Sequence, residues 1–152
     1  MNKVVGVVLC GMLLLEGCSQ GTTDIAASAS FDALKNRNLS GRVVPVGDLD
    51  KKVVVEGIPD SDFRVVMEVS CKNGDANASS GAEMLFRWKD NRLDVLPEDC
   101  RLSGGGERPA VRRENDREFT VYYPVELRGK RSWAKFHVIV DTDQGRKSRP
   151  VP

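Results

Sequence analysis

Residues 119–127, FTVYYPVEL, and residues 133–140, WAKFHVIV, decide the fold of this chain. In both stretches apolar residues alternate with polar ones, which is the period-two pattern of a half-buried β-strand. Only Arg128 to Ser132 lie between them, so the two strands are predicted to pair as an antiparallel hairpin. Pro124 has no N–H group to donate to a ladder, and the first strand is therefore expected at a sheet edge or with a bulge there.

The same pattern extends towards the N-terminus. Residues 42–46 and 52–56 are valine-rich runs, and residues 83–89 and 93–96 flank the turn residues Asp90 and Asn91. One longer strand places five side chains on a single core-facing side: Phe63, Val65, Met67, Val69 and Cys71. Residues 72–82 and 98–114 are predicted to be loops, the second one containing three consecutive glycines from Gly104.

These elements predict an all-β fold. Seven or eight short strands favour a small antiparallel β-sandwich or barrel. One short N-terminal helix is expected over Phe31 to Asn38, with Ser30 as its N-cap. The β domain is expected to span residues 31–143 and to be followed by a disordered basic tail, residues 144–152.

The first residues have the layout of a secretory signal peptide. Lys3 supplies the positive charge, and Val4 to Leu15 form an apolar run that is too short to span a bilayer comfortably. The motif Leu15-Glu16-Gly17-Cys18 resembles the lipobox of bacterial lipoproteins.

The lipoprotein resemblance implies a signal peptide over residues 1–17 and lipid on Cys18, usually as two or three acyl chains, enough for stable anchoring. Ser19 after the cysteine implies transfer to the outer membrane, with the domain on the periplasmic side. Residues 18–30 are small and polar and are predicted to be the lipidated cysteine and a flexible tether. The alternative is an ordinary signal peptide that releases a soluble secreted protein.

The charge balance gives no argument for a nucleic-acid partner. Lys and Arg number 23 against 22 Asp and Glu, and the two signs are interspersed. The remaining cysteines, Cys71 and Cys100, are predicted to form a disulfide, because exported thiols tend to oxidise. A metal or catalytic thiol is the alternative, but two cysteines and one histidine are a poor ligand set.

The chain has no recognisable catalytic motif or cofactor signature, and we predict a protein without catalysis, cofactor or metal. The alternative is a carboxylate-based hydrolase, for which Asp60 with Asp62, or Glu98 with Asp99, are the available pairs. Both pairs stand beside prolines in turn-like sequence, where acidic residues are expected for local reasons.

A protein-binding surface is the favoured function class. Alternation places Tyr122, Trp133 and His137 on the outward side of the last hairpin, and aromatic residues are enriched at protein interfaces. The alternative is that a second layer covers this face. Arg128, Lys130 and Arg131 at the hairpin tip are candidates for contact with an acidic partner.

Two functions fit a small lipid-tethered binding domain. In the first it is an inhibitor or immunity lipoprotein against an enzyme that attacks the cell envelope. In the second it is an accessory lipoprotein of a secretion or envelope assembly, similar in layout to the pilotins. Both imply a membrane contact through Cys18 and a protein partner in the periplasm.

Overall fold

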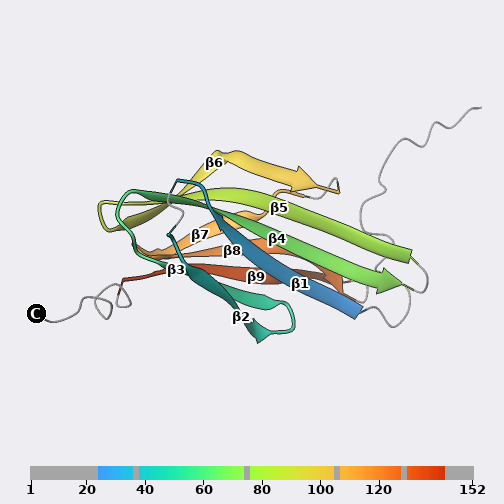
Figure 1. Cartoon of the computed structure of the whole chain (residues 1–152). Coiled ribbons are helices and arrows are strands. Elements are labelled where there is room, and N and C mark those ends of the chain that lie inside the picture. Colours follow the sequence, from blue (N-terminus) through green and yellow to red (C-terminus); the bar gives the residue numbers. More distant parts are fainter. Residues whose placement is uncertain (1–23, 36–37, 74–75, 105–106, 128–129, 143–152) are drawn as a thin grey trace, which may run out of the picture.

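The computed structural model describes residues 24–35, 38–73, 76–104, 107–127 and 130–142. These residues form nine β-strands in two sheets that pack face to face as a β-sandwich (Figure 1). The strands are β1 (Asp24–Ala33), β2 (Gly41–Gly47), β3 (Asp50–Glu56), β4 (Ser61–Asn73), β5 (Ala76–Lys89), β6 (Arg92–Ser103), β7 (Ala110–Asn115), β8 (Glu118–Leu127) and β9 (Lys130–Asp141). The all-β prediction is confirmed, and the sandwich is the form that it takes.

The strand order gives a four-stranded sheet, β1-β4-β5-β6, and a five-stranded sheet, β2-β3-β9-β8-β7. Most neighbours are antiparallel, as predicted, but β3 and β9 are parallel, with Asp50 opposite Lys135 and Glu56 opposite Asp141. This pairing brings the first hairpin of the sheet beside the last strand of the domain. Among the described residues, no helix is long and apolar enough to cross a membrane.

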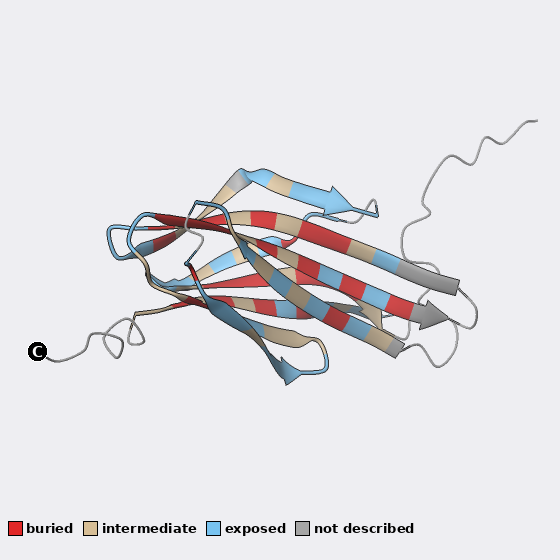
Figure 2. Cartoon of the chain, viewed as in Figure 1, coloured by how far each residue is buried: buried red, intermediate tan, exposed pale blue. Residues whose placement is uncertain are grey.

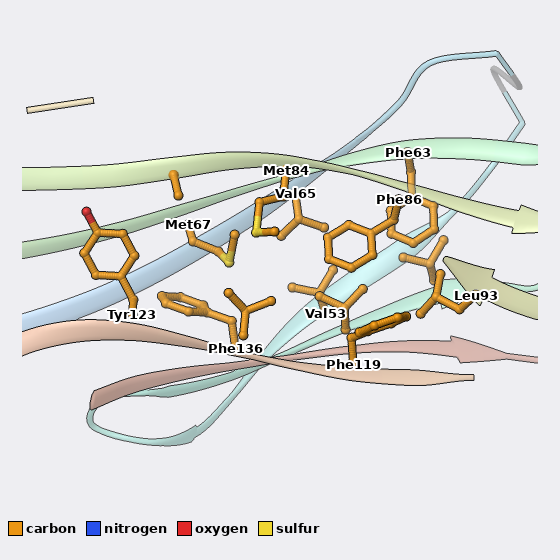
Figure 3. Close-up of a cluster of buried hydrophobic side chains, with 14 of the residues drawn as sticks. Val53, Phe63, Val65, Met67, Met84, Phe86, Leu93, Phe119, Tyr123 and Phe136 are labelled. Atoms are coloured by element: carbon orange, nitrogen blue, oxygen red, sulfur yellow. The ribbon is translucent and has the colours of Figure 1, made fainter. Parts of the chain in front are cut away.

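The core lies between the two sheets, where buried positions alternate along the central strands (Figure 2). The predicted inward face of β4, from Phe63 to Cys71, is buried as expected. Phe63 stacks on Phe86 across β4 and β5, with ring centroids 5.6 Å apart, and Phe86 meets Phe119 of β8 edge to face at 6.1 Å (Figure 3). These rings join the start of β4 to the start of β8 across the sandwich.

The predicted N-terminal helix is wrong. Phe31 to Ala33 complete β1, and Leu34 and Lys35 form a bend after it. Phe31 packs against the core, with its ring centroid 6.5 Å from that of Phe63. A helix of two turns is marginal in water, and pairing with β4 satisfies the same backbone groups while it buries the phenyl ring.

The predicted boundary between tether and domain is also wrong. Strand β1 begins at Asp24, so residues 24–30 belong to the domain and not to the tether. Their pairing with β4 puts Ala27 and Ala29 on the core side. The predicted signal peptide, Cys18, residues 19–23 and the predicted tail from residue 144 lie outside the described residues.

Two predicted loops are largely strand. Strands β4 and β5 continue through most of residues 72–82, with Lys72 opposite Asn77, and β6 runs to Ser103 before a turn at Gly104. Residues 110–115 then form β7. These residues show little alternation of apolar and polar side chains, because many of them are small or polar residues with low intrinsic β propensity. The strands continue through them because backbone N–H and C=O groups pair whatever the side chains are.

The prediction for Pro124 agrees with the register of β8. Strand β7 pairs with β8 only as far as Tyr122, so Pro124 has a ladder partner on the β9 side alone, opposite Trp133. Although β8 is an inner strand of its sheet, it is locally an edge at this residue. Proline is found at such edge positions of a sheet.

The predicted Cys71–Cys100 disulfide is wrong, because Cys100 is a free cysteine. Strand β5 lies between the strands that carry the two residues. Cys71 is opposite Ala78 of β5, whereas Arg101, next to Cys100, is opposite Glu83. This offset corresponds to roughly 20 Å along the strands, while bridged cysteines have Cα atoms no more than about 7 Å apart.

Candidate protein-binding face

The outer face of the five-stranded sheet is the candidate site. On this face Pro124 of β8 lies opposite Trp133 of β9, and Tyr122 lies opposite Lys135. The indole of Trp133 is 39% exposed, so no second layer of described residues covers it. The sequence left open whether a second layer covers this face, and no such layer of described residues lies over Trp133.

Tyr122 and Trp133 form the centre of a row of four stacked side chains. Their rings meet edge to face with centroids 6.4 Å apart. The guanidinium carbon of Arg112 lies 5.4 Å from the centre of the Tyr122 ring, and that of Arg131 lies 5.0 Å from the centre of the Trp133 indole. We call Arg112, Tyr122, Trp133 and Arg131 the aromatic ladder.

Carboxylates hold both ends of the aromatic ladder. Arg112 donates to Glu114 at 2.6 Å, and Arg131 donates to both oxygens of Glu107 at 2.9 and 3.0 Å. Paired guanidinium groups that also stack on rings keep the aromatic side chains in fixed positions. The ladder is therefore an ordered surface, which costs less side-chain entropy on binding than a set of free side chains.

A polar cluster stands beside the ladder and consists of Glu114, Glu118, Thr120 and His137. The imidazole Nδ1 of His137 is 3.3 Å from the Thr120 hydroxyl and 3.6 Å from a carboxylate oxygen of Glu118. The Thr120 hydroxyl and the Arg112 guanidinium both donate to Glu114 and hold the pKa of that carboxyl below its usual range.

The structure brings together some of the predicted contact residues. Tyr122 and Trp133 touch, and His137 lies on the same face in the polar cluster. Lys130 and Arg131 are exposed at the hairpin tip, and Arg128 lies outside the described residues. The prediction missed Arg112 and Glu114. Both lie two residues apart in β7, on the side that alternates with the half-buried Val111 and Arg113, and this spacing was the signal that could have identified them.

Of the carboxylates considered for hydrolysis, Asp62 is held in ion pairs by two basic side chains. Asp62 is 4% exposed, accepts two hydrogen bonds from Arg87 at 2.9 and 3.2 Å, and is 2.7 Å from the Lys35 ammonium. Hydrogen bonding from Arg87, more than any other contact, holds the pKa of Asp62 below its usual value. Asp62 is thus stabilised as an ion, which does not suit the general acid of a glycosidase.

The other three carboxylates considered for hydrolysis, Asp60, Glu98 and Asp99, are exposed to solvent. Asp60 occupies a tight turn with a φ of 52°, a conformation in which aspartate is common. Glu98 and Asp99 are both exposed on β6, an edge strand of the other sheet.

No protein-family model, curated protein or solved structure matches this chain. The fold and the outer face of the five-stranded sheet therefore carry the functional argument.

Proposed function

We propose that this protein is a lipid-anchored binding module without catalysis, held at the outer membrane on its periplasmic side. It acts as an inhibitor or immunity lipoprotein against an enzyme that targets the cell envelope. The aromatic ladder carries this proposal, because it is an exposed and ordered aromatic surface. The lipobox-like sequence that ends at Cys18 supports the anchor.

The chemistry of the ladder fits the core of a protein interface. Tyrosine, tryptophan and arginine are the residues most enriched among those that dominate binding energy at interfaces. The ladder holds two residues with aromatic rings and two arginines within one connected row. Because each arginine already has a carboxylate partner, a protein that covers the ladder does not have to neutralise a bare charge.

The anchor is tested with Cys18→Ser. We expect the wild-type protein to incorporate labelled palmitate and the variant to remain an uncleaved precursor or a soluble protein without label. Unchanged labelling of the variant would refute lipidation at Cys18.

The binding face is tested by photo-crosslinking in cells. A photoreactive amino acid in place of Tyr122 should capture the partner, whereas the same group in place of Glu98 on the four-stranded sheet should not. After the partner is identified, Trp133→Ala should weaken its affinity by about 30-fold or more, while Leu102→Ala, another exposed apolar residue, should leave it unchanged.

The outcome also distinguishes the classes of function. A captured envelope-degrading enzyme whose turnover falls in proportion to added protein would support the inhibitor function. A captured secretion or assembly component would instead favour the accessory, pilotin-like function. Peptidoglycan turnover by the protein itself that is lost with Glu98→Gln or Asp99→Asn would overturn the binding class.

A further inference from the structure

Strand β1 is an open edge of the four-stranded sheet (Figure 1). Among the described residues it pairs with β4 alone, in one register from Asp24 to Ala33. The N–H of Leu34 donates to the carbonyl of Asp62, which lies opposite it in the same register. Because hydrogen-bonded and non-hydrogen-bonded pairs alternate in an antiparallel ladder, the even-numbered residues of β1 bond to β4. The odd-numbered residues direct their backbone N–H and C=O groups away from the sheet.

The other three edge strands of the described sandwich carry features that hinder the addition of a further strand. Strand β2 contains Pro45 and a register shift directly after it. The ladder between β5 and β6 is interrupted between Leu96 and Arg101. Strand β7 has only six residues, includes a register shift and carries Arg112 and Arg113. Prolines, bulges, charged side chains and short strands are the usual means by which proteins keep sheet edges from pairing.

Strand β1 has none of these features in its central part. It contains no proline, its register is unbroken, and its charged residues are Asp24 and Asp32 near its two ends. The side chains between them on the outer side, Ala26, Ser28 and Ser30, are small and exposed. Such side chains let another backbone approach the edge, but they form no pockets of the kind that select a foreign peptide. A second copy of the same strand fits this edge best.

Antiparallel pairing of two identical strands satisfies the outward backbone groups by symmetry. With a two-fold axis at Ala27, Ile25 of one copy lies opposite Ala29 of the second copy, and each opposed pair of odd-numbered residues exchanges N–H···O=C bonds. A shift of the axis by one residue towards the C-terminus would bring the like-charged Asp24 and Asp32 to opposed positions, which is unfavourable. Symmetric contacts of this kind are the commonest ones between identical chains.

We propose that two copies of this chain associate through antiparallel pairing of their β1 strands, with the two-fold axis at Ala27. Their four-stranded sheets then join into one continuous sheet. The aromatic ladder lies on the other sheet of each copy, so the contact does not use it. The contact also does not depend on lipid at Cys18.

The first test follows the deuterium exchange of single amides by NMR as the concentration of the purified full chain is raised. The Ala27 and Ala29 amides should exchange at least about tenfold more slowly at high concentration, because they become bonded to the second copy. The Ala26 and Ser28 amides are already bonded to β4, and their exchange should not change. Sedimentation velocity on the same samples should show the monomer converting to a dimer.

The second test uses a matched pair of edge variants. Ser28→Lys places a charge beside the two-fold axis and should weaken dimerisation by about tenfold or more. Since Ser28 is exposed, the melting temperature of the monomer should not change. Val44→Lys puts the same charge at an exposed position of the β2 edge and should leave dimerisation as it is in the wild type.

Several outcomes would overturn the proposal. One is a protein that stays monomeric at every concentration and exchanges its Ala27 and Ala29 amides rapidly. Slow exchange of these amides that does not depend on concentration would mean that the edge is covered within a single copy. Slow exchange that appears only after another protein is added would make a foreign strand the occupant. Equal weakening by Ser28→Lys and Val44→Lys would show that the contact is not at β1.

Discussion

Replacing Tyr123 by phenylalanine should stabilise the protein. Tyr123 is 1% exposed, and its hydroxyl has no hydrogen-bond partner in the part of the chain that the structure describes. Figure 3 shows the residue among apolar side chains between the two sheets. A buried polar group without a partner costs about 1–3 kcal/mol relative to its hydrated state in the unfolded chain. Phenylalanine removes that cost and keeps the ring in the core.

The stabilisation expected for Tyr123→Phe can be measured by urea unfolding. With a gain of about 2 kcal/mol, the middle of that range, and a denaturant slope of about 2 kcal/mol per M, typical of a small domain, the midpoint should rise by roughly 1 M in Tyr123→Phe. The slope itself should not change, since the same surface is exposed on unfolding. The preceding residue provides the control, because Tyr122 lies on the outer face and Tyr122→Phe should change the free energy of unfolding by no more than about 0.5 kcal/mol.

A lower midpoint for Tyr123→Phe would refute the reasoning. Loss of about 1 kcal/mol or more would mean that the hydroxyl makes a hydrogen bond in the folded protein. A change in slope would instead mean that the variant alters the compactness of the folded or unfolded state. An unchanged midpoint in both variants would mean that burial of this hydroxyl carries no cost.

Three further predictions concern stability. Phe86→Ala should cost about 3–5 kcal/mol in urea unfolding, because it removes the ring that contacts both sheets; a cost below about 1 kcal/mol would contradict the packing. Because the folded pKa of Asp62 is lowered, the stabilisation by its ionised form is present above pH ~4 and is lost as the pH falls through the folded value. Arg87→Gln should therefore reduce the loss of stability on acidification, and parallel curves for the two proteins would contradict this. Cys100→Ser should shift the melting temperature by only a few degrees, in contrast to the loss expected for a disulfide, and alkylation of native Cys100 should be slow because burial raises the pKa of its thiol.

Strands with strong local alternation could be predicted from the sequence. The face from Phe63 to Cys71 and the last hairpin follow directly from the period of two, since one residue of slippage would move all their apolar side chains into solvent. Strand β1 has the same alternation in Ile25, Ala27, Ala29 and Phe31. Its small residues resemble those of a linker, however, so composition concealed the pattern.

Contacts between distant parts of the chain could not be predicted in this way. The parallel pairing of β3 with β9 joins residues 50–56 to residues 135–141, and no local signal specifies it. The cysteine pairing failed for the same reason, because sequence spacing does not show that β5 lies between β4 and β6. For the candidate site, alternation identified Tyr122, Trp133 and His137, but the contribution of Arg112 depends on the register of β7, which only the folded sheet shows.

The two outer faces of the sandwich explain why only one of them is proposed as a binding surface. On the four-stranded sheet, Arg64 pairs with Glu83, and Arg87 pairs with Asp62, which gives a polar surface that water solvates well. The Arg64–Glu83 pair is partly exposed, and an ion pair of that kind contributes little to stability. On the five-stranded sheet, ion pairs instead hold the guanidinium groups that stack on Tyr122 and Trp133. A tryptophan that is exposed but fixed in place adds little to folding, so its use is best sought in what the face binds.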